Sequence, residues 1–367
     1  MTPESQKRFS LTDLRQALDA RQSIQNADLS GLDLTGENLH LANFKGCNLN
    51  QTRLAGQCLE KTGFADCSFR GADLSGCSFT DMFLRRLDFT DANLQNTFFL
   101  RCHCSGSNFT RANFTSARIH WTFLDRTICV EAVFRSAQFL KSVGLEANLT
   151  GADMQDAILE RLTLRKAVLE GVNLRSVTFD RVNLSAARLP GHDFSGQKLR
   201  SVNFMGADLS GVSFKNADIS TCVFQSAVLT GALLEDVTAR QCMFAGANME
   251  NVRASAGDFT QSFFGEASLS HADFRKASLR DAKFTRAKIL EAAFMDADCF
   301  NNDFSHADLS GSDFSRANLY LACMHMTVQE KTVFTGANTL YLRGPDPDMA
   351  EAEAFRPPIQ HDKNKRS

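Results

Sequence analysis

A period of five residues runs through almost the whole chain. From residue 29 to residue 334, the positions whose numbers end in 4 or 9 carry Leu, Phe, Ile or Met at all but seven of 62 sites, and no insertion shifts the frame. A small residue, usually Ala, lies two positions earlier. An α-helix repeats its apolar face every 3.6 residues and a half-buried strand every second residue, so this period fits neither. A fixed short period over a long chain is typical of a solenoid.

The repeating unit resembles the consensus of the pentapeptide-repeat family, which is close to A(D/N)LXX. The sequence ADLSG itself occurs at 27–31, 72–76, 207–211 and 307–311. The resemblance implies that family's fold, an all-β, right-handed quadrilateral β-helix with one pentapeptide on each of four faces. The residues support this fold independently, because one large and one small inward side chain per unit fill a narrow square. Stacked coils would then pair at the strand spacing of about 4.8 Å.

We therefore expect one β-helical domain over 25–341, preceded by a capping segment over 1–24. Residues 1–9 are expected to be loose, and a helix is expected from Ser10 to about Arg21, capped by Ser10 or Thr12. Its apolar face would consist of Leu11, Leu14 and Leu18. The helix would cover the open strand edges at this end of the rod, or alternatively dock a partner.

Residues 342–367 are expected to form a short helix followed by a disordered polar tail. Pro347 at the first position and Asp346 as the cap predict a helix from about Pro347 to Phe355. The final residues HDKNKRS are too polar to pack. We interpret this helix as a cap for the last coil or, as in some members of the family, as a dimer contact.

Composition argues against several classes of partner. The 40 Lys and Arg residues nearly balance 42 Asp and Glu residues, giving a formal net charge of −2. Such a balance does not indicate a nucleic-acid surface. No apolar run approaches the length of about 18 residues that a membrane-spanning helix needs, and the N-terminal residues lack the apolar core of a signal peptide. We expect a cytoplasmic protein that binds neither nucleic acid nor membrane.

The cysteines follow the repeat and do not form a separate pattern. We assign seven to the small inward position, where Cys replaces Ala as a small hydrophobe: Cys47, Cys67, Cys77, Cys102, Cys222, Cys242 and Cys323. Cys47 and Cys67, like Cys222 and Cys242, should stack one coil apart, within disulfide reach. A cytoplasmic setting favours free thiols, with disulfides as the alternative.

The sequence contains no catalytic constellation. Cys102, His103 and Cys104 suggest a metal site, but their side chains should alternate in and out of the rod and so cannot share a tetrahedral ion. Asp and Ser recur because the repeat uses them in turns, and no phosphate loop or glycine fingerprint is present. We expect no enzyme activity, no cofactor and no metal.

Large apolar side chains occupy outward positions in the middle of the chain. The candidate partner-binding patch comprises Phe83, Phe98, Leu100, His103, His120, Trp121, Phe123 and Leu140. Residues 20 apart should lie in successive coils, so these residues form two columns that flank one corner. Contiguous exposed apolar surface marks a contact site, unless a terminal segment folds back over it. A second candidate contact near the end comprises Phe300, Tyr320, Leu321, Leu340 and Tyr341.

A rigid rod with such a patch favours a non-catalytic scaffold or adaptor for a protein partner, because a preorganised surface loses little entropy on binding. The resemblance implies a place beside bacterial secretion machinery, including type VI effector systems. It also implies an alternative, a DNA mimic that binds gyrase or topoisomerase and gives quinolone or toxin resistance. That mechanism needs an acidic rod, whereas the charges here balance. A structural or secreted effector rod is the third possibility. We expect a monomer or a C-terminally mediated dimer.

Overall fold

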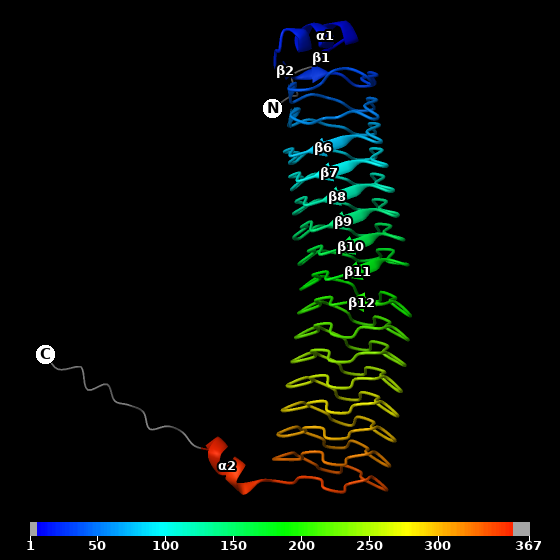
Figure 1. The fold of residues 1–367 in the computed structure, drawn as a ribbon, viewed down its shortest axis with the longest axis vertical. Helices are drawn as coiled ribbons and strands as arrows, with labels where there is room; N and C mark the ends of the chain where they lie inside the picture. The colour runs from blue at the N-terminus through cyan, green and yellow to red at the C-terminus, as the bar shows by residue number, and fades with distance from the viewer. Residues whose placement is uncertain (1–5, 355–367) are drawn as a thin grey trace, which may run out of the picture.

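The chain winds into one long rod in this computed structural model, which describes residues 6–354 (Figure 1). Parallel bridges join each coil to the next at a constant offset of 20 residues, as in Asp28 to Asn48 and Asp208 to Val228. Turns recur every five residues, so each coil has four sides. The right-handed quadrilateral β-helix predicted from the sequence is confirmed.

Within residues 6–354, the strands form three parallel sheets, and single bridges hold the remaining coils. A seven-stranded sheet runs along one face of the rod through β6 (Ser78–Thr80), β7 (Phe98–Leu100), β8 (Arg118–His120), β9 (Gln138–Leu140), β10 (Ile158–Glu160), β11 (Thr178–Asp180) and β12 (Leu199–Arg200). Nearer the N-terminus, a three-stranded sheet consists of β2 (Ile24–Gln25), β4 (Asn43–Lys45) and β5 (Gly63–Ala65), and a two-stranded sheet consists of β1 (Lys7–Arg8) and β3 (Ala27–Asp28). The pairing of β1 differs from the expectation that residues 1–9 are loose.

Inward side chains form continuous ladders along the rod. Leu209, Phe214 and Phe224 are fully buried, as the repeat predicts. Six phenylalanines stack in successive coils with ring centroids 4.7–5.1 Å apart: Phe204, Phe224, Phe244, Phe264, Phe284 and Phe304. This spacing suits both strand pairing and aromatic stacking, so backbone and core stabilise the same geometry.

Each corner contains one residue with positive φ. Glycine supplies it at some corners, such as Gly211 with φ 65°, and carries no steric cost there. Many other corners use bulkier residues, such as Arg86 at 57° and Trp121 at 56°. A left-handed conformation costs such residues about 1–2 kcal/mol. Pairing with the next coil offsets this cost, because the Trp121 N–H donates to the Leu140 carbonyl at 2.8 Å.

The helix α1 (Leu11–Asp19) closes the N-terminal end of the rod (Figure 1). Ser10 and Asp13 form a reciprocal cap, in which the Ser10 hydroxyl accepts from the Asp13 N–H and the Asp13 carboxylate accepts from the Ser10 N–H. Leu14 is fully buried against the first coils, while Leu11 and Leu18 are half-buried. The apolar face of α1 therefore covers the first coil, as expected.

The helix α2 (Pro347–Ala354) begins as predicted but projects to the side of the rod (Figure 1). Asp346 caps it by accepting from the Asp348 N–H at 3.0 Å, and the predicted end at Phe355 lies outside the described residues. None of its residues is buried. Its sequence, PDMAEAEA, contains one large apolar side chain, so it has no face with which to cover the last coil. The position of α2 thus differs from the expected cap.

The cysteines of the described chain are all free thiols. The assignment of Cys323 to the small inward position was wrong, because Ala322 fills that site and Cys323 is only half-buried. Burial raises the pKa of the Cys77 and Cys129 thiols to about 12, which keeps them protonated and poorly reactive. Among residues 6–354, no helix combines the length and the apolar character needed to cross a membrane.

Candidate functional site

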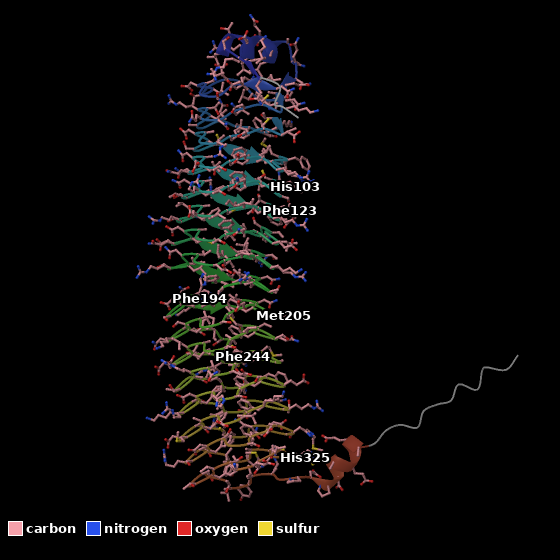
Figure 2. All side chains as sticks on the ribbon, turned by 180° about the vertical axis from the view of Figure 1, so that it is seen from behind. His103, Phe123, Phe194, Met205, Phe244 and His325 are labelled. Atoms are coloured by element: carbon pink, nitrogen blue, oxygen red, sulfur yellow. The ribbon has the colours of Figure 1, made fainter. Side chains whose placement is uncertain are left out.

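Three rings form an exposed column in successive coils near the middle of the rod. His103 lies between Phe83 and Phe123, with ring centroids 4.9 and 4.8 Å apart and planes within 14° of parallel. Parallel bridges between the three residues fix this register. Phe83 is 65% exposed and Phe123 is 39% exposed. We call these three residues the aromatic column; Figure 2 shows His103 and Phe123 one above the other at the edge of the rod.

A second column lies on the neighbouring face, where the sheet positions it. Leu100, His120 and Leu140 are the last residues of β7, β8 and β9 and pair in register. The Phe98 ring meets the His120 ring edge-on at 5.4 Å, and the Arg118 guanidinium lies 5.0 Å from the centre of the Phe98 ring. All of these predicted patch residues are half-buried.

Trp121 occupies the corner between the two columns and joins them. Its side chain is 48% exposed, and the Lys141 ammonium lies 4.2 Å from its ring centroid. Beside it, Arg101 forms a bidentate ion pair with Asp81. The eight predicted patch residues thus form one surface around this corner, which we call the central patch. Neither α1 nor α2 covers it, since they lie at opposite ends of the rod (Figure 1).

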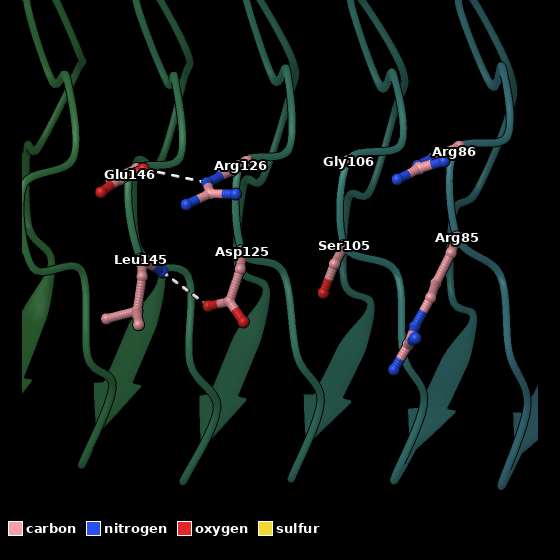
Figure 3. A pocket seen from close by; sticks show the side chains of 8 residues that line it. All are labelled: Arg85, Arg86, Ser105, Gly106, Asp125, Arg126, Leu145 and Glu146. Carbon is pink, nitrogen blue, oxygen red and sulfur yellow. Dashed lines mark hydrogen bonds and ion pairs between the residues drawn. The ribbon is translucent and has the colours of Figure 1, made fainter.

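An arginine-lined hollow adjoins the aromatic column, because its residue Arg85 lies over the Phe83 ring. Figure 3 shows the side chains that line this hollow. Its volume is about 730 Å³, and it is lined by Arg85, Arg86, Ser105, Gly106, Asp125, Arg126, Leu145 and Glu146. Gly106 lies between Arg86 and Arg126 in the same corner column and leaves the space open. We call this hollow the arginine notch. The sequence did not predict this hollow, because the missing side chain at Gly106 has meaning only when the coils are stacked.

The charges in the arginine notch are incompletely paired. Arg126 Nε lies 3.0 Å from a Glu146 oxygen, which lowers the pKa of that carboxyl. Asp125 accepts a hydrogen bond from the Leu145 N–H. Within the described residues, Arg85 and Arg86 have no carboxylate within ion-pair distance, although Arg85 lies over the Phe83 ring at 5.5 Å. The notch therefore offers two unpaired guanidinium groups beside exposed aromatic rings.

The second predicted contact forms a smaller aromatic cluster near the C-terminal end. Phe300 stacks on Tyr320 at 5.8 Å, and Tyr320 meets Tyr341 edge-on at 5.5 Å. Leu340 and Tyr341 are 58% and 64% exposed, whereas Leu321 is half-buried. Nearby, Met326, Val328 and Val333 of the last coil are also exposed, which leaves this end of the rod apolar and open.

His306, His325 and Glu353 form a cluster that the sequence prediction missed, since it depends on where α2 docks (His325 is labelled in Figure 2). Glu353 Oε2 lies 3.0 Å from His306 Nε2 and 3.6 Å from His325 Nε2. The Asp346 N–H donates to His325 Nδ1, which places the proton of the neutral ring on Nε2, facing Glu353. A metal would need that nitrogen unprotonated, so the cluster fits an attachment for α2 better than an ion site.

The structure also separates the residues of the apparent Cys-His-Cys metal motif. Cys102 and Cys104 are fully buried inside the rod, while His103 belongs to the exposed aromatic column. The predicted alternation is therefore confirmed, and these three side chains do not share a site.

Family models match most of the chain. Residues 23–56, 67–216 (in overlapping segments) and 292–327 match the model described as pentapeptide repeats (8 copies), and residues 217–294 match the model described as a pentapeptide repeat region. The comparison with curated proteins finds no match.

Solved structures of other repeat proteins are also similar. HetL, involved in heterocyst differentiation regulation in the cyanobacterium Nostoc sp. strain PCC 7120, is 18% identical over 92% of this chain and 98% of its own, with a TM-score of 0.21. QnrB1, a plasmid-mediated fluoroquinolone resistance protein, is 12% identical over 64% and 88% of the two chains, with a TM-score of 0.28. A thylakoid-lumen protein of Arabidopsis thaliana is 27% identical over 36% and 69%, with a TM-score of 0.13. At such TM-scores, the fold assignment depends on the coils of this chain alone.

Proposed function

The chain belongs to the pentapeptide-repeat family, and from this premise we propose that it is a non-catalytic scaffold or adaptor that binds a protein partner through the central patch. The observation that supports the proposal most is the aromatic column, which stays exposed in the middle of a rigid rod. Burial of Trp121 with Phe83 and Phe123 would contribute about 25 cal/mol for each Å² of apolar surface removed from water. Such aromatic anchors dominate the energy of protein interfaces.

The arginine notch favours an acidic partner. Arg85 and Arg86 are exposed and can pair with carboxylates of another molecule, because the described chain provides none within ion-pair distance. Their position beside the aromatic column suggests a partner segment in which an acidic residue neighbours an apolar one. Charge pairs at the rim of an interface mainly accelerate association, and salt screens them. We therefore expect association to slow as ionic strength rises.

The experiment compares affinity capture from the native host by the wild-type chain and by the double variant Trp121→Ala with Leu140→Ser. Capture of a defined partner should be lost in this variant, while its melting temperature stays close to that of the wild type. The matched control is Met205→Ala with Met243→Ser, which removes two exposed apolar side chains outside the patch and should retain the partner. A large fall in the melting temperature of the patch variant would instead identify these residues as part of the core.

We also propose, from the family resemblance alone, that the partner belongs to a bacterial secretion system of the type VI effector class. Mass spectrometry of the protein retained by the wild type and lost by the patch variant tests this. A partner outside any secretion system would leave the scaffold proposal standing and refute this part.

Two other functions remain as alternatives. A mimic of DNA that binds gyrase must present rows of uncompensated acidic groups. In this rod many surface carboxylates are paired with arginine one coil away, as in Asp81 with Arg101, Asp91 with Arg111 and Asp296 with Arg316. A structural or secreted effector rod would need no partner at the central patch, so the capture experiment distinguishes it from the scaffold.

A further inference from the structure

The ladder of backbone bridges between coils is interrupted at one place in the middle of the rod. Bridges join Asp153 to Asn173 and Asp193 to Ser213, but none joins Asn173 to Asp193. On the next face, β11 and β12 pair only from Phe179 and Leu199 onward. In most coils, the N–H at this position donates to the carbonyl of the residue 19 positions later, as Met154 does to Asn173. In the described chain, the N–H groups of Leu174 and Ser176 have no such carbonyl partner.

Two polar side chains at the small inward position coincide with the interruption. His192 and Gln197 occupy sites that hold Ala or Val in most coils, and they stack over Val172 and Val177. Volume alone is not the reason, because buried Leu87 and Leu162 occupy the same position and their bridges are intact. The branched leucines fit the close-packed interior, whereas the extended polar side chains of His192 and Gln197 do not. The same effect recurs elsewhere in the described chain, where Gln57 and Met82 occupy this position and the bridges from residue 38 to 58 and from residue 63 to 83 are missing.

The interruption leaves buried polar groups without partners. Both ring nitrogens of His192, which is 8% exposed, and Oε1 of Gln197 have no hydrogen bond. Gln197 Nε2, by contrast, donates to the Leu174 carbonyl at 3.2 Å. Burial lowers the pKa of His192, although nearby carbonyls oppose the shift, so the ring is neutral and offers one donor and one acceptor. Buried polar groups are normally paired, so these atoms are available to hydrogen-bond a molecule that enters the hollow.

Two adjoining open hollows lie along the interrupted stretch of the ladder. One, of about 550 Å³, is lined by Asn173, Arg175, His192, Ser195, Gln197 and their neighbours. The other, of about 740 Å³, shares Arg175, Ser195 and Gln197 with it and continues around the corner. We call the two together the coil slot. Each has the size of a ligand site, about 300–1,000 Å³.

We infer that the coil slot binds an extended peptide segment of a partner protein. The edges of the slot are unpaired strand edges, with N–H groups on Leu174 and Ser176 and carbonyl groups on Asp193 and Ser195. A peptide backbone supplies alternating acceptors and donors that match such edges, as in strand addition to an open sheet.

The groups inside the slot define the side chain that such a peptide must carry. Gln197 Oε1 needs a donor, and the neutral His192 ring can pair with a donor or an acceptor. A hydroxyl or amide side chain pointing into the rod meets both needs. The slot is lined by three basic residues (Arg175, Lys198 and Arg200) and two acidic ones (Asp180 and Asp193). Its net charge is therefore small, and hydrogen bonds contribute more than net charge to recognition. This site is independent of the central patch.

Hydrogen exchange of the free protein is the first arm of the test. The amides of Leu174 and Ser176 should exchange at least about tenfold faster than those of Met154 and Asp156, which occupy the same positions one coil earlier and are paired. Equal protection of the two sets would show that the ladder is closed in solution, and would overturn the inference.

The second arm selects binders from a random 12-residue peptide library displayed on phage. The wild-type chain should enrich peptides with Ser, Thr, Asn or Gln at one fixed position. The double variant His192→Ala with Gln197→Ala should bind them at least about tenfold more weakly, the loss expected for a few hydrogen bonds. This variant should also restore the missing amide protection, because small residues let the coils close, so loss of binding would not reflect unfolding.

The control is Cys222→Ala with Val237→Ala, which changes the small inward position where the ladder is intact and should leave peptide binding unchanged. The inference fails if no peptide is enriched on the wild type relative to the double variant His192→Ala with Gln197→Ala. It also fails if both proteins bind the selected peptides equally. Either result leaves the central patch and its partner unaffected.

Discussion

The direction of a side chain, into or out of the rod, decides what each residue of the repeat contributes. Phe244 and Phe83 are the same residue type, yet Phe244 is fully buried between Phe224 and Phe264 while Phe83 is 65% exposed. The small inward position is equally sensitive. Ala fits this position without disturbance. Thr or Cys there can donate a hydrogen bond to the carbonyl 23 residues earlier. His192 and Gln197 at this position coincide with a break in the ladder of backbone bridges.

The inward stack predicts a large cost for truncation. Phe244→Ala removes a ring that stacks on both sides at 5.0 and 4.9 Å, so we expect a loss of about 3–5 kcal/mol in the free energy of unfolding. Guanidinium unfolding measures it. Phe83→Ala is the control, because its exposed ring should contribute far less to stability. Similar losses in the two variants would contradict the assignment of inward and outward positions.

At the scale of elements, the ends of the rod show how small segments attach to the coils. The strand β1 is held to β3 by backbone pairing and by an ion pair of 2.8 Å between Arg8 and Asp28. Asp28 also accepts a 2.6 Å hydrogen bond from the Ser30 hydroxyl. The hydrogen bond from this hydroxyl is the largest cause, and that from Arg8 the second, of the lowering of the Asp28 pKa from 3.8 to about 2. The helix α1 docks through buried Leu14, whereas α2 attaches only through polar contacts.

The attachment of β1 should therefore depend on pH. Because the pKa of Asp28 is lower in the folded protein, its contribution is complete above the ordinary value of 3.8 and is lost as the pH falls through about 2. We expect the Phe9 amide, which donates to the Asp28 carbonyl at 2.9 Å, to lose protection from hydrogen exchange over this range.

Substitution of Arg8, the ion-pair partner of Asp28, tests this pH dependence. Arg8→Gln should move the transition to higher pH, whereas Arg53→Gln, which removes the ion pair with Asp33, should not. A β1 strand that stays protected at pH values well below the folded pKa would refute the role of Asp28.

For the whole molecule, the two ends of the rod are unlike. The helix α1 covers the first coil, but the last coil leaves Met326, Val328 and Val333 exposed and Phe334 only half-buried. An open strand edge with apolar side chains favours association with another chain. Within the described residues, a helix therefore covers the first coil, whereas the last coil exposes apolar side chains.

We expect this open end to mediate a dimer. Val333→Asp should shift the protein to monomer in sedimentation velocity, because it places a charge in the apolar contact. Val228→Asp, at a similarly exposed site within the rod, should leave the dimer intact. A wild-type chain that remains monomeric at high concentration would exclude association through the last coil.

The charge of the whole rod predicts that it does not inhibit DNA gyrase. With 40 basic and 42 acidic residues, its field does not resemble that of a nucleic acid. A supercoiling assay should show full gyrase activity at low-micromolar concentrations of the protein. Inhibition in that range would favour the DNA-mimic alternative over the scaffold.

The sequence alone determined the fold and the direction of nearly every side chain. The frame of five specifies which residues point inward, because each turn of the chain has the same length and local period leads directly to position, as at Leu209 and Phe214. It therefore also placed the two columns of the central patch, since residues 20 apart lie in adjacent coils.

Only the tertiary structure decided features that depend on contacts between coils or with the ends. The arginine notch exists because Gly106 stacks between two arginines. The coil slot lies where His192 stacks over Val172. Both depend on which side chains meet across 20 residues. The docking of α2 on His306 and its failure to cover the last coil were likewise not predicted, because that helix lies beyond the repeat. A repeat fixes position within the rod, whereas side-chain volume and polar pairing determine how well neighbouring coils fit.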